Sequence, residues 1–233
     1  RKIITILFLT SHTISYALIN ISPVLIEFSY KQSAIEVVLD NNETQEKVFE
    51  ASIKQWKQEN GEDVYTETDE VLVLPAMRRV APGSRQKFRV IVRKKTDGAM
   101  QKPFRLFFRE VPHSIKNISP KAALSISFQL VLPVFVNEKN YERKDDIIWT
   151  AQYNENSKKI LLKLENKGNT FFKFGALRAN EIIKPINREW RYVLPNNEIS
   201  WEIKGSSSIH NILSLNFFEL VDQKQVAKTN VVE

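Results

Sequence analysis

The sequence predicts an all-β protein made of two immunoglobulin-like β-sandwich domains, and three observations lead to this prediction. Short segments of alternating apolar and polar residues recur along the chain, turn-forming residues separate them, and no segment shows a sustained helical period. The chain has 233 residues, of which 42% are hydrophobic, so two domains can each bury a core. About seven strands at short spacing are typical of one immunoglobulin-like sandwich of about 100 residues.

The first 17 residues differ in character from the rest of the chain. Arg1-Lys2 is a short positive region, residues 3–10 are an apolar run, and Ser15-Tyr16-Ala17 is a small-x-small cleavage pattern. The apolar run is too short to span a bilayer, which requires about 20 residues. We therefore expect residues 1–17 to be a secretory signal peptide rather than a membrane anchor, and the mature chain to be exported without membrane insertion.

Residues 18–137 are the predicted first domain, and alternation of apolar residues marks its strands. Turns are expected at Asp40-Asn41-Asn42, Asn60-Gly61 and Pro82-Gly83. The expected strands lie near residues 24–28, 35–39, 48–56, 71–74, 88–92, 104–108 and 124–136.

The last of these segments, residues 124–136, is roughly twice as long as a usual strand of about 5–6 residues. Strict alternation places its apolar side chains on one face of an extended strand. These side chains are Leu124, Ile126, Phe128, Leu130 and Leu132. Each is worth roughly 1.5–3 kcal/mol when buried, so another surface must cover them. Alternation alone leaves two covering surfaces open, the domain's own second sheet and a partner.

A polar stretch at residues 137–146 is expected to link the domains. Residues 138–233 are the predicted second domain, also a β-sandwich, with turns at residues 166–169 and 195–197. Its expected strands lie at residues 147–153, 160–164, 170–174, 192–194, 199–203 and 213–220.

Composition argues against several chemistries. The absence of cysteine rules out disulfides, thiolate metal sites and cysteine nucleophiles. After the signal peptide only His113 and His210 remain, which excludes a histidine-rich metal site. No Gly-x-Ser-x-Gly, phosphate loop or His-Glu-x-x-His occurs. We therefore expect no enzyme activity, no catalytic residues, no metal and no cofactor.

The net charge of +7 includes a basic stretch at residues 78–95. A nucleic-acid surface would combine such a cluster with stacking aromatic side chains on the same face. Only Phe88 is interleaved, and on an alternating strand it points away from Lys87 and Arg89. We expect a solvated strand face and no nucleic-acid partner.

Several motifs follow one another in a fixed order along the chain. In the first domain they are Ser22-Pro23-Val24, W-x-Q-x-x-G-x-D from Trp56 to Asp63, P-G-x-x-Q-x-x-R from Pro82 to Arg89, the run from Phe104 to Pro112, and P-V-F-V at residues 133–136. Residues 164–169, residues 192–195 and Trp201 continue the series in the second domain. In this order they resemble the periplasmic chaperones of the chaperone–usher pilus pathway, and the W-x-Q-x-x-G-x-D and P-V-F-V motifs resemble its archaic branch.

This resemblance implies a function. Such chaperones bind pilus subunits that lack the last strand of their own sandwich, and they lend a strand of their own by β-strand addition. The lent strand covers a subunit edge that would otherwise aggregate, and the subunit then passes to an outer-membrane usher. With the resemblance included, we expect the five alternating side chains of residues 124–132 to contact the subunit, and no nucleotide or other cofactor is implied.

The chain also departs from the better-known branch of this family, in which a basic pair grips the C-terminal carboxylate of the subunit. Leu25 and Pro133 occupy the matching positions, so another cation must serve if the carboxylate is held. We consider Arg89 and Arg109, which lie in predicted strands of the first domain; solvated outer-face arginines are the alternative for both. At the domain joint, Gln101 and Asn137 stand where the family pattern has charged residues.

A function of another class remains open. An exported two-domain immunoglobulin-like adhesion or receptor module without chaperone activity would have the same strand pattern. The sequons at Asn42 and Asn117 would suit such a surface protein.

Overall fold

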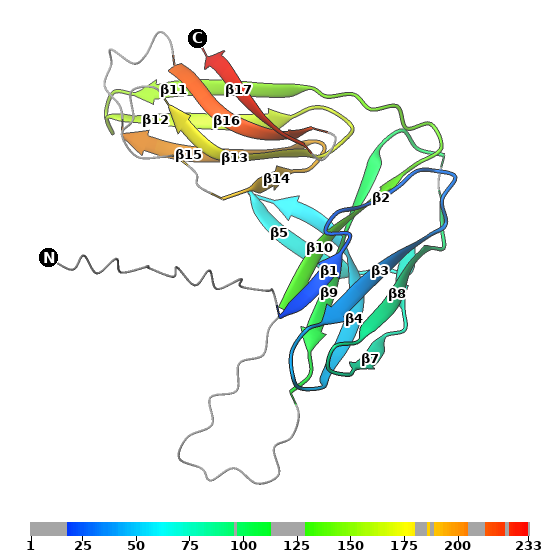
Figure 1. Cartoon of the computed structure of the whole chain (residues 1–233). Coiled ribbons are helices and arrows are strands. Elements are labelled where there is room, and N and C mark those ends of the chain that lie inside the picture. The colour runs from blue at the N-terminus through cyan, green and yellow to red at the C-terminus, as the bar shows by residue number, and fades with distance from the viewer. Residues whose placement is uncertain are drawn as a thin grey trace, which may run out of the picture.

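The computed structural model describes residues 18–95, 97–112, 129–179, 186, 189–204, 213–221 and 224–232. These residues form β-strands and no helix, arranged in four sheets, which confirms the predicted all-β, two-sandwich fold (Figure 1). Residues 1–17, the predicted signal peptide, lie outside the described part. Within that part no helix has the length and hydrophobicity of a membrane span.

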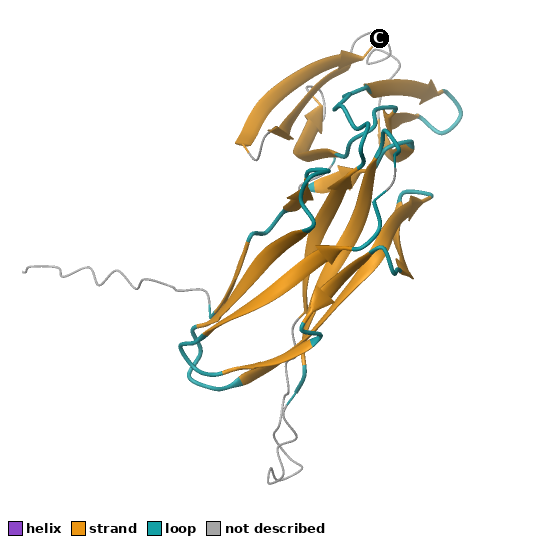
Figure 2. Ribbon diagram, turned by 90° about the vertical axis from the view of Figure 1, so that its right-hand side faces the viewer, coloured by secondary structure: helices purple, strands orange, loops and turns teal. Residues whose placement is uncertain are grey.

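The first domain consists of two facing sheets (Figure 2). The sheet that we call the β8 sheet has the order β1-β3-β8-β6, and the one that we call the β10 sheet has the order β2-β10-β9-β4-β5, with β7 paired to β4. The strands of the β8 sheet are β1 (Ile19–Ser22), β3 (Ala34–Asn41), β8 (Arg85–Val92) and β6 (Val71–Leu74). Those of the β10 sheet are β2 (Ile26–Phe28), β10 (Gln129–Asn137), β9 (Gln101–Glu110), β4 (Lys47–Glu59), β5 (Glu62–Glu67) and β7 (Met77–Val80).

The core of the first domain lies between these two sheets and is rich in phenylalanine. Strand β9 shows how the sequence builds it, since Phe104, Leu106 and Phe108 are fully buried while the residues between them point outward. Phe88 of the β8 sheet meets Phe108 edge to face, with ring centres 4.8 Å apart. Such pairs add about 0.5–1.5 kcal/mol beyond the burial of their area.

The second domain also has two sheets, one with the order β11-β12-β15 and one with the order β14-β13-β16-β17. Its strands are β11 (Ile147–Asn154), β12 (Lys159–Asn166), β13 (Phe172–Ala179), β14 (Arg191–Val193), β15 (Asn197–Lys204), β16 (Leu213–Val221) and β17 (Lys224–Val232). Trp149, Leu162 and Phe174 are among its buried core residues.

Most expected strands are present within a few residues of their predicted ends, but four strands were not predicted. They are β1, β5, β7 and β17. Strands β5 and β7 are rich in charged and exposed residues and lack apolar alternation, which explains why the pattern did not indicate them. Of the long strand expected at residues 124–136, the structure describes the part from Gln129 onward.

The two domains meet through a small hydrophobic cluster and a set of polar contacts. Trp56 and Phe135 from the first domain pack with Phe171 and Leu194 from the second, and the rings of Phe135 and Phe171 stack with centres 4.0 Å apart. The tip of the β4–β5 hairpin reaches the second domain beside β14 (Figure 1). The domain joint is therefore a packed interface with contacts from several strands.

Candidate functional site

One edge of strand β10 is partly open. Strand β9 pairs antiparallel with all of β10, from Gln129 opposite Arg109 to Asn137 opposite Gln101. On the other side, β2 pairs in parallel only with residues 134–136. Among the described strands, residues 129–133 therefore have a neighbour on one side only. An unpaired edge of this kind is a template for a strand from another chain.

The two faces of β10 have different surroundings. Val134 and Val136 point into the core of the first domain, Leu132 lies there with 6% of its surface exposed, and Leu130 packs against the rim of that core. Val131, on the opposite face, is 37% exposed. Leu132 thus packs in the domain's own core and Leu130 at its rim, which is the covering surface that alternation had left open beside a partner. Leu124, Ile126 and Phe128 lie outside the described residues.

The outer face of the β10 sheet forms a shallow depression over β9, β4 and β5, on the side of β10 away from the open edge. Tyr65 of β5 and Phe107 of β9 meet edge to face, with ring centres 5.2 Å apart. The depression has a volume of about 610 Å³ and is lined by Glu50, Ser52, Lys54, Tyr65, Glu67, Phe107, Arg109 and Gln129. This mixed aromatic and charged surface is therefore separated from the open edge by β10 itself.

The two arginines that we considered as carboxylate anchors lie in different places. Arg109 is exposed on the outer face of the β10 sheet, and its Nε donates to Oε2 of Glu50 at 3.0 Å. Arg109 lies near one end of β9, whereas Gln101, at the other end, contacts the second domain. Arg89 is exposed on the β8 sheet, opposite Glu36, and so lies on the other side of the sandwich. The structure does not bring Arg89 and Arg109 together, and neither lines the cleft described below.

Arg105, which the sequence did not single out, occupies the interdomain cleft. In the β10 sheet it stands between Pro133 of β10 and Lys54 of β4. Its guanidinium carbon lies 3.6 Å from the centre of the Trp56 ring and 5.1 Å from that of Tyr192. Only 11% of its side chain is exposed, and an oxygen of Asp63 lies 3.7 Å from its Nη2. Its Nε is buried without a hydrogen-bond partner among the described residues.

A second cation approaches Tyr192 from the second domain. Lys173 of β13 pairs across the sheet with Tyr192 of β14, and its Nζ lies 4.8 Å from the centre of the Tyr192 ring. Burial lowers the pKa of Lys173, and the positive charge of Arg105 lowers it further. Burial also lowers the pKa of Arg105 and raises that of Tyr192 to about 12. Arg105 and Lys173, one from each domain, are thus two desolvated cations on one aromatic ring.

Arg105 and Tyr192 line a cleft of about 290 Å³ between the domains. Gln58, Gly61, Glu62, Asp63, Glu189, Trp190, Arg191, Glu198 and Ile199 complete its lining. The carboxylate of Asp63 is already engaged, because Gln58 donates to it at 3.0 Å and the Tyr65 hydroxyl at 3.1 Å. An anionic group that enters beside Arg105 would relieve the repulsion between the two cations.

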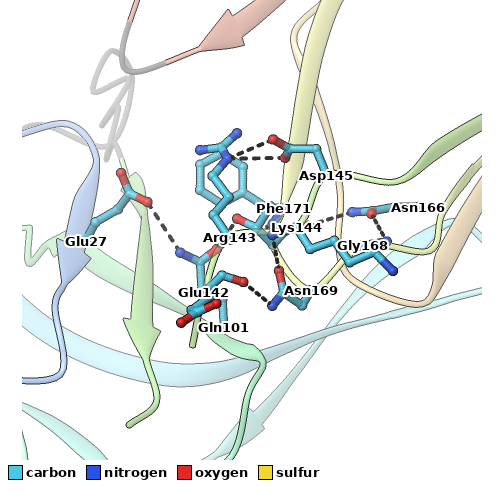
Figure 3. Close-up of polar contacts among 11 residues, drawn as sticks. Glu27, Gln101, Glu142, Arg143, Lys144, Asp145, Asn166, Gly168, Asn169 and Phe171 are labelled. Atoms are coloured by element: carbon cyan, nitrogen blue, oxygen red, sulfur yellow. Dashed lines mark hydrogen bonds and ion pairs between the residues drawn. The ribbon is translucent and has the colours of Figure 1, made fainter. Parts of the chain in front are cut away.

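The polar part of the domain joint is centred on two amide side chains (Figure 3). Gln101 is buried, donates to Oδ1 of Asn137 at 2.9 Å and accepts a hydrogen bond from the Thr170 hydroxyl at 3.1 Å. The Asn169 amide donates to the carbonyls of Ala99 and Glu142, at 2.9 and 2.7 Å. Gln101 also donates to Oε1 of Glu27 at 3.3 Å. Two amide side chains thus occupy the positions where the family pattern led us to expect charged residues.

The described residues contain no group of three or more histidine, aspartate or glutamate side chains placed to hold a metal ion. The features that stand out in this part of the chain are instead an open strand edge and an interdomain cleft that contains a buried arginine. The cleft is lined by two cations, Arg105 and Arg191, and by the carboxylates of Glu62, Asp63, Glu189 and Glu198. The edge is suited to binding the main chain of another polypeptide, and Arg105 to binding an anionic group.

Comparison with known proteins places this arrangement in a family. Residues 18–141 match the family model described as "Pili and flagellar-assembly chaperone, PapD N-terminal domain". The chain therefore belongs to this family of pilus-assembly chaperones, as the sequence motifs indicated. Comparison with curated protein sequences gives no match.

Solved structures of pilus chaperones share the two-domain fold. A chain from the CsuC–CsuE chaperone–tip adhesion subunit complex of archaic Csu pili of Acinetobacter baumannii aligns with a TM-score of 0.71 and 19% identity, covering 91% of this chain and 98% of that one. A chain from the Salmonella enterica SafA pilin–SafB chaperone complex gives 0.69 and 14%, covering 96% and 100%. The Pseudomonas aeruginosa CupB2 chaperone gives 0.64 and 13%, covering 92% and 100%. At these identities the likeness establishes a shared fold.

Proposed function

We propose that this protein is a periplasmic chaperone that binds pilus subunits by donating strand β10 to them and delivers them to an outer-membrane usher. The observation that carries the proposal is the open edge of β10 at residues 129–133. Membership of the chaperone family and the pilin and tip-subunit complexes of the structural neighbours support a pilus subunit as the partner. The predicted signal peptide at residues 1–17 supports export.

We place the partner-facing side chains of the donated strand at Leu124, Ile126 and Phe128. Burial in the domain's own core weakens along β10 from Val134, fully buried, through Leu132 to the partly buried Leu130. In the sequence the same alternation continues for three more apolar residues beyond Leu130. Because the core covers Leu132 and part of Leu130, we expect the three preceding side chains to supply most of the apolar surface that a subunit buries.

We place the anionic group of the subunit, its C-terminal carboxylate, at Arg105 and Lys173. The two cations approach the same ring from different domains, and burial deprives both of part of their hydration. A carboxylate would accept charge-assisted hydrogen bonds from the Arg105 guanidinium, whose Nη2 lies 3.7 Å from the nearest oxygen of Asp63. This assignment replaces Arg89 and Arg109, which lie outside the cleft.

Co-expression of this chain with a pilus subunit tests the proposal. A chaperone should keep the subunit soluble in a one-to-one complex, and cross-linking should place the subunit against residues 124–133. An adhesion or receptor module would leave the subunit insoluble. A stable complex in which residues 124–133 remain as accessible as in the free protein would refute strand donation.

A further inference from the structure

We propose that Gln58 is a positioning residue that braces the β4–β5 hairpin against β14 and so fixes Tyr192 and Lys173 relative to Arg105. The consequence for subunit binding rests on the proposed function, whereas the brace itself is a property of the free protein.

The side chain of Gln58 pairs with the main chain of the second domain as a neighbouring strand would. Its Nε2 donates to the carbonyl oxygen of Tyr192 at 2.9 Å, and the main-chain N–H of Leu194 donates to its Oε1 at 2.9 Å. One amide side chain thus satisfies a carbonyl and an N–H at the edge of the second domain. Strand β14 is the terminal strand of its sheet, so these groups face away from β13.

The β4–β5 hairpin that contains Gln58 ends in a tight two-residue turn. Strands β4 and β5 remain paired as far as Glu59 opposite Glu62. Asn60 and Gly61 connect them with φ angles of 54° and 80°, the positive values that a tight Asn-Gly hairpin turn requires. Nε2 of Gln58 also donates to Oδ1 of Asp63 on β5 at 3.0 Å, which holds its amide in place.

An aromatic contact reinforces the same junction. Trp56 lies two residues before Gln58 on the same face of β4, and its ring meets that of Tyr192 edge to face with centres 5.4 Å apart. The guanidinium of Arg105 also packs against the face of the Trp56 ring. The hairpin therefore contacts both the main chain and the side chain of Tyr192, the ring on which Arg105 and Lys173 converge.

The Gln58 contact is separate from the joint around Gln101 and Asn169. Gln101 connects β9 and β10 with Thr170, which precedes β13, whereas Gln58 connects β4 with β14. The Gln101 joint and the hydrophobic cluster hold one side of the interface, and the Gln58 contact adds a directional link between a different pair of strands. Without Gln58, β14 would lose its hydrogen bonds to the hairpin, and we expect the position of Lys173 relative to Arg105 to vary more widely.

Distance measurements between the domains test this inference. Because the natural chain has no cysteine, spin labels can be attached at Asn20→Cys and Thr150→Cys, two exposed positions in different domains. The Gln58→Met variant keeps the length of the side chain but loses both hydrogen bonds, and Gln58→Asn keeps the amide but is too short to reach. Lys57→Met, at the exposed neighbouring position, is the control.

We expect pulsed electron–electron double resonance to give one narrow distribution of the distance between the labels for the unaltered protein and for Lys57→Met. Both Gln58 variants should give a broadened or shifted distribution. Thermal unfolding by circular dichroism shows that each variant is folded. An unchanged distribution in folded Gln58→Met and Gln58→Asn would overturn the inference, whether or not the protein binds a subunit.

Subunit affinity provides a second readout. If Gln58 acts through Arg105, replacing Arg105 with methionine should cost several-fold less affinity in the Gln58→Met background than in the unaltered protein. Equal losses in both backgrounds would show that Gln58 does not position the cationic pair. A broadened distribution in a protein that binds no subunit would support the brace and refute the proposed function.

Discussion

Arg105 illustrates how the position of a residue in the fold determines what it can do. Three arginines of the first domain lie in alternating strands, Arg89 in β8 and both Arg105 and Arg109 in β9. Arg89 and Arg109 are exposed, whereas Arg105 lies beneath Tyr192 and on the face of Trp56. Strand alternation predicts that all three point outward, but only the second domain turns the outer face at Arg105 into a cleft. The sequence alone could not reveal that contact.

At this scale we predict that Arg105→Met weakens subunit binding roughly tenfold or more, equivalent to the loss of about one charge-assisted hydrogen bond. The free energy of unfolding should stay the same or rise, because an apolar side chain avoids the desolvation of a buried cation. Calorimetric titration with a purified subunit and denaturant unfolding measure the two quantities. Arg109→Met is the matched control, and an equal loss of affinity in that variant would contradict the assignment.

Lys173 gives subunit binding a predicted pH dependence. Its pKa lies below the ordinary 10.5, so it loses its charge at a lower pH than an exposed lysine. Affinity for an anionic group should therefore fall as the pH rises through this lowered pKa. The free protein should behave in the opposite way: between the lowered pKa and 10.5 the unfolded chain binds more protons, so stability increases with pH. Lys173→Arg should remove the decline in affinity, and its persistence in that variant would exclude Lys173 as the cause.

At the scale of the element, we propose two roles for β10, one in the core of its own domain and one toward a partner. The alternation of apolar residues correctly predicted a strand with one apolar face, but it did not reveal which surface covers that face at each position. Burial by the domain's own core includes Leu132 and, in part, Leu130, and for this reason we propose that the partner-facing part of the predicted set is Leu124, Ile126 and Phe128. The covering surface depends on where the opposing sheet ends, and that is a tertiary property.

We predict opposite effects for two substitutions in this strand. Leu132→Ala should lower the free energy of unfolding of the free protein by about 2–5 kcal/mol, as expected for a buried leucine. Phe128→Asp should leave that free energy nearly unchanged and abolish subunit capture. Denaturant unfolding and co-purification measure the two effects. Leu161→Asp, at an exposed leucine of the second domain, is the control for adding a charge. If Phe128→Asp destabilised the free protein as strongly as Leu132→Ala, Phe128 would belong to the internal core.

At the scale of the whole molecule, the sequence predicted two sandwiches and a joint without the charged residues of the family pattern. Within the described residues, the structure adds that Gln101 and Asn169 connect the domains through neutral hydrogen bonds. The two-domain fold could be predicted because each sandwich has its own alternating strands. The contacts at the domain joint could not be predicted, because the residues that form them lie far apart in the sequence and show no shared periodicity.

We predict that Gln101→Leu lowers the free energy of unfolding by about 1–3 kcal/mol, because it leaves buried polar groups of Asn137 and Thr170 without this partner. Chemical denaturation measures the loss. Gln152→Leu, at an exposed position of the second domain, should have an effect within about 0.5 kcal/mol. A similar small effect at Gln101 would mean that the buried amide does not stabilise the joint.

The short parallel strand β2 has a consequence for how a bound segment leaves. Because β2 occupies the edge of β10 at residues 134–136 and Pro133 has no N–H to donate, the accessible edge stops at that proline. A guest strand cannot slide past this stop, so its register is set there. If a subunit strand pairs with residues 124–133 as proposed, a competitor would start at the end of this segment away from β2 and exchange hydrogen bonds stepwise toward Pro133. The direction of release would then depend on the three residues of β2, which do not pair with the guest.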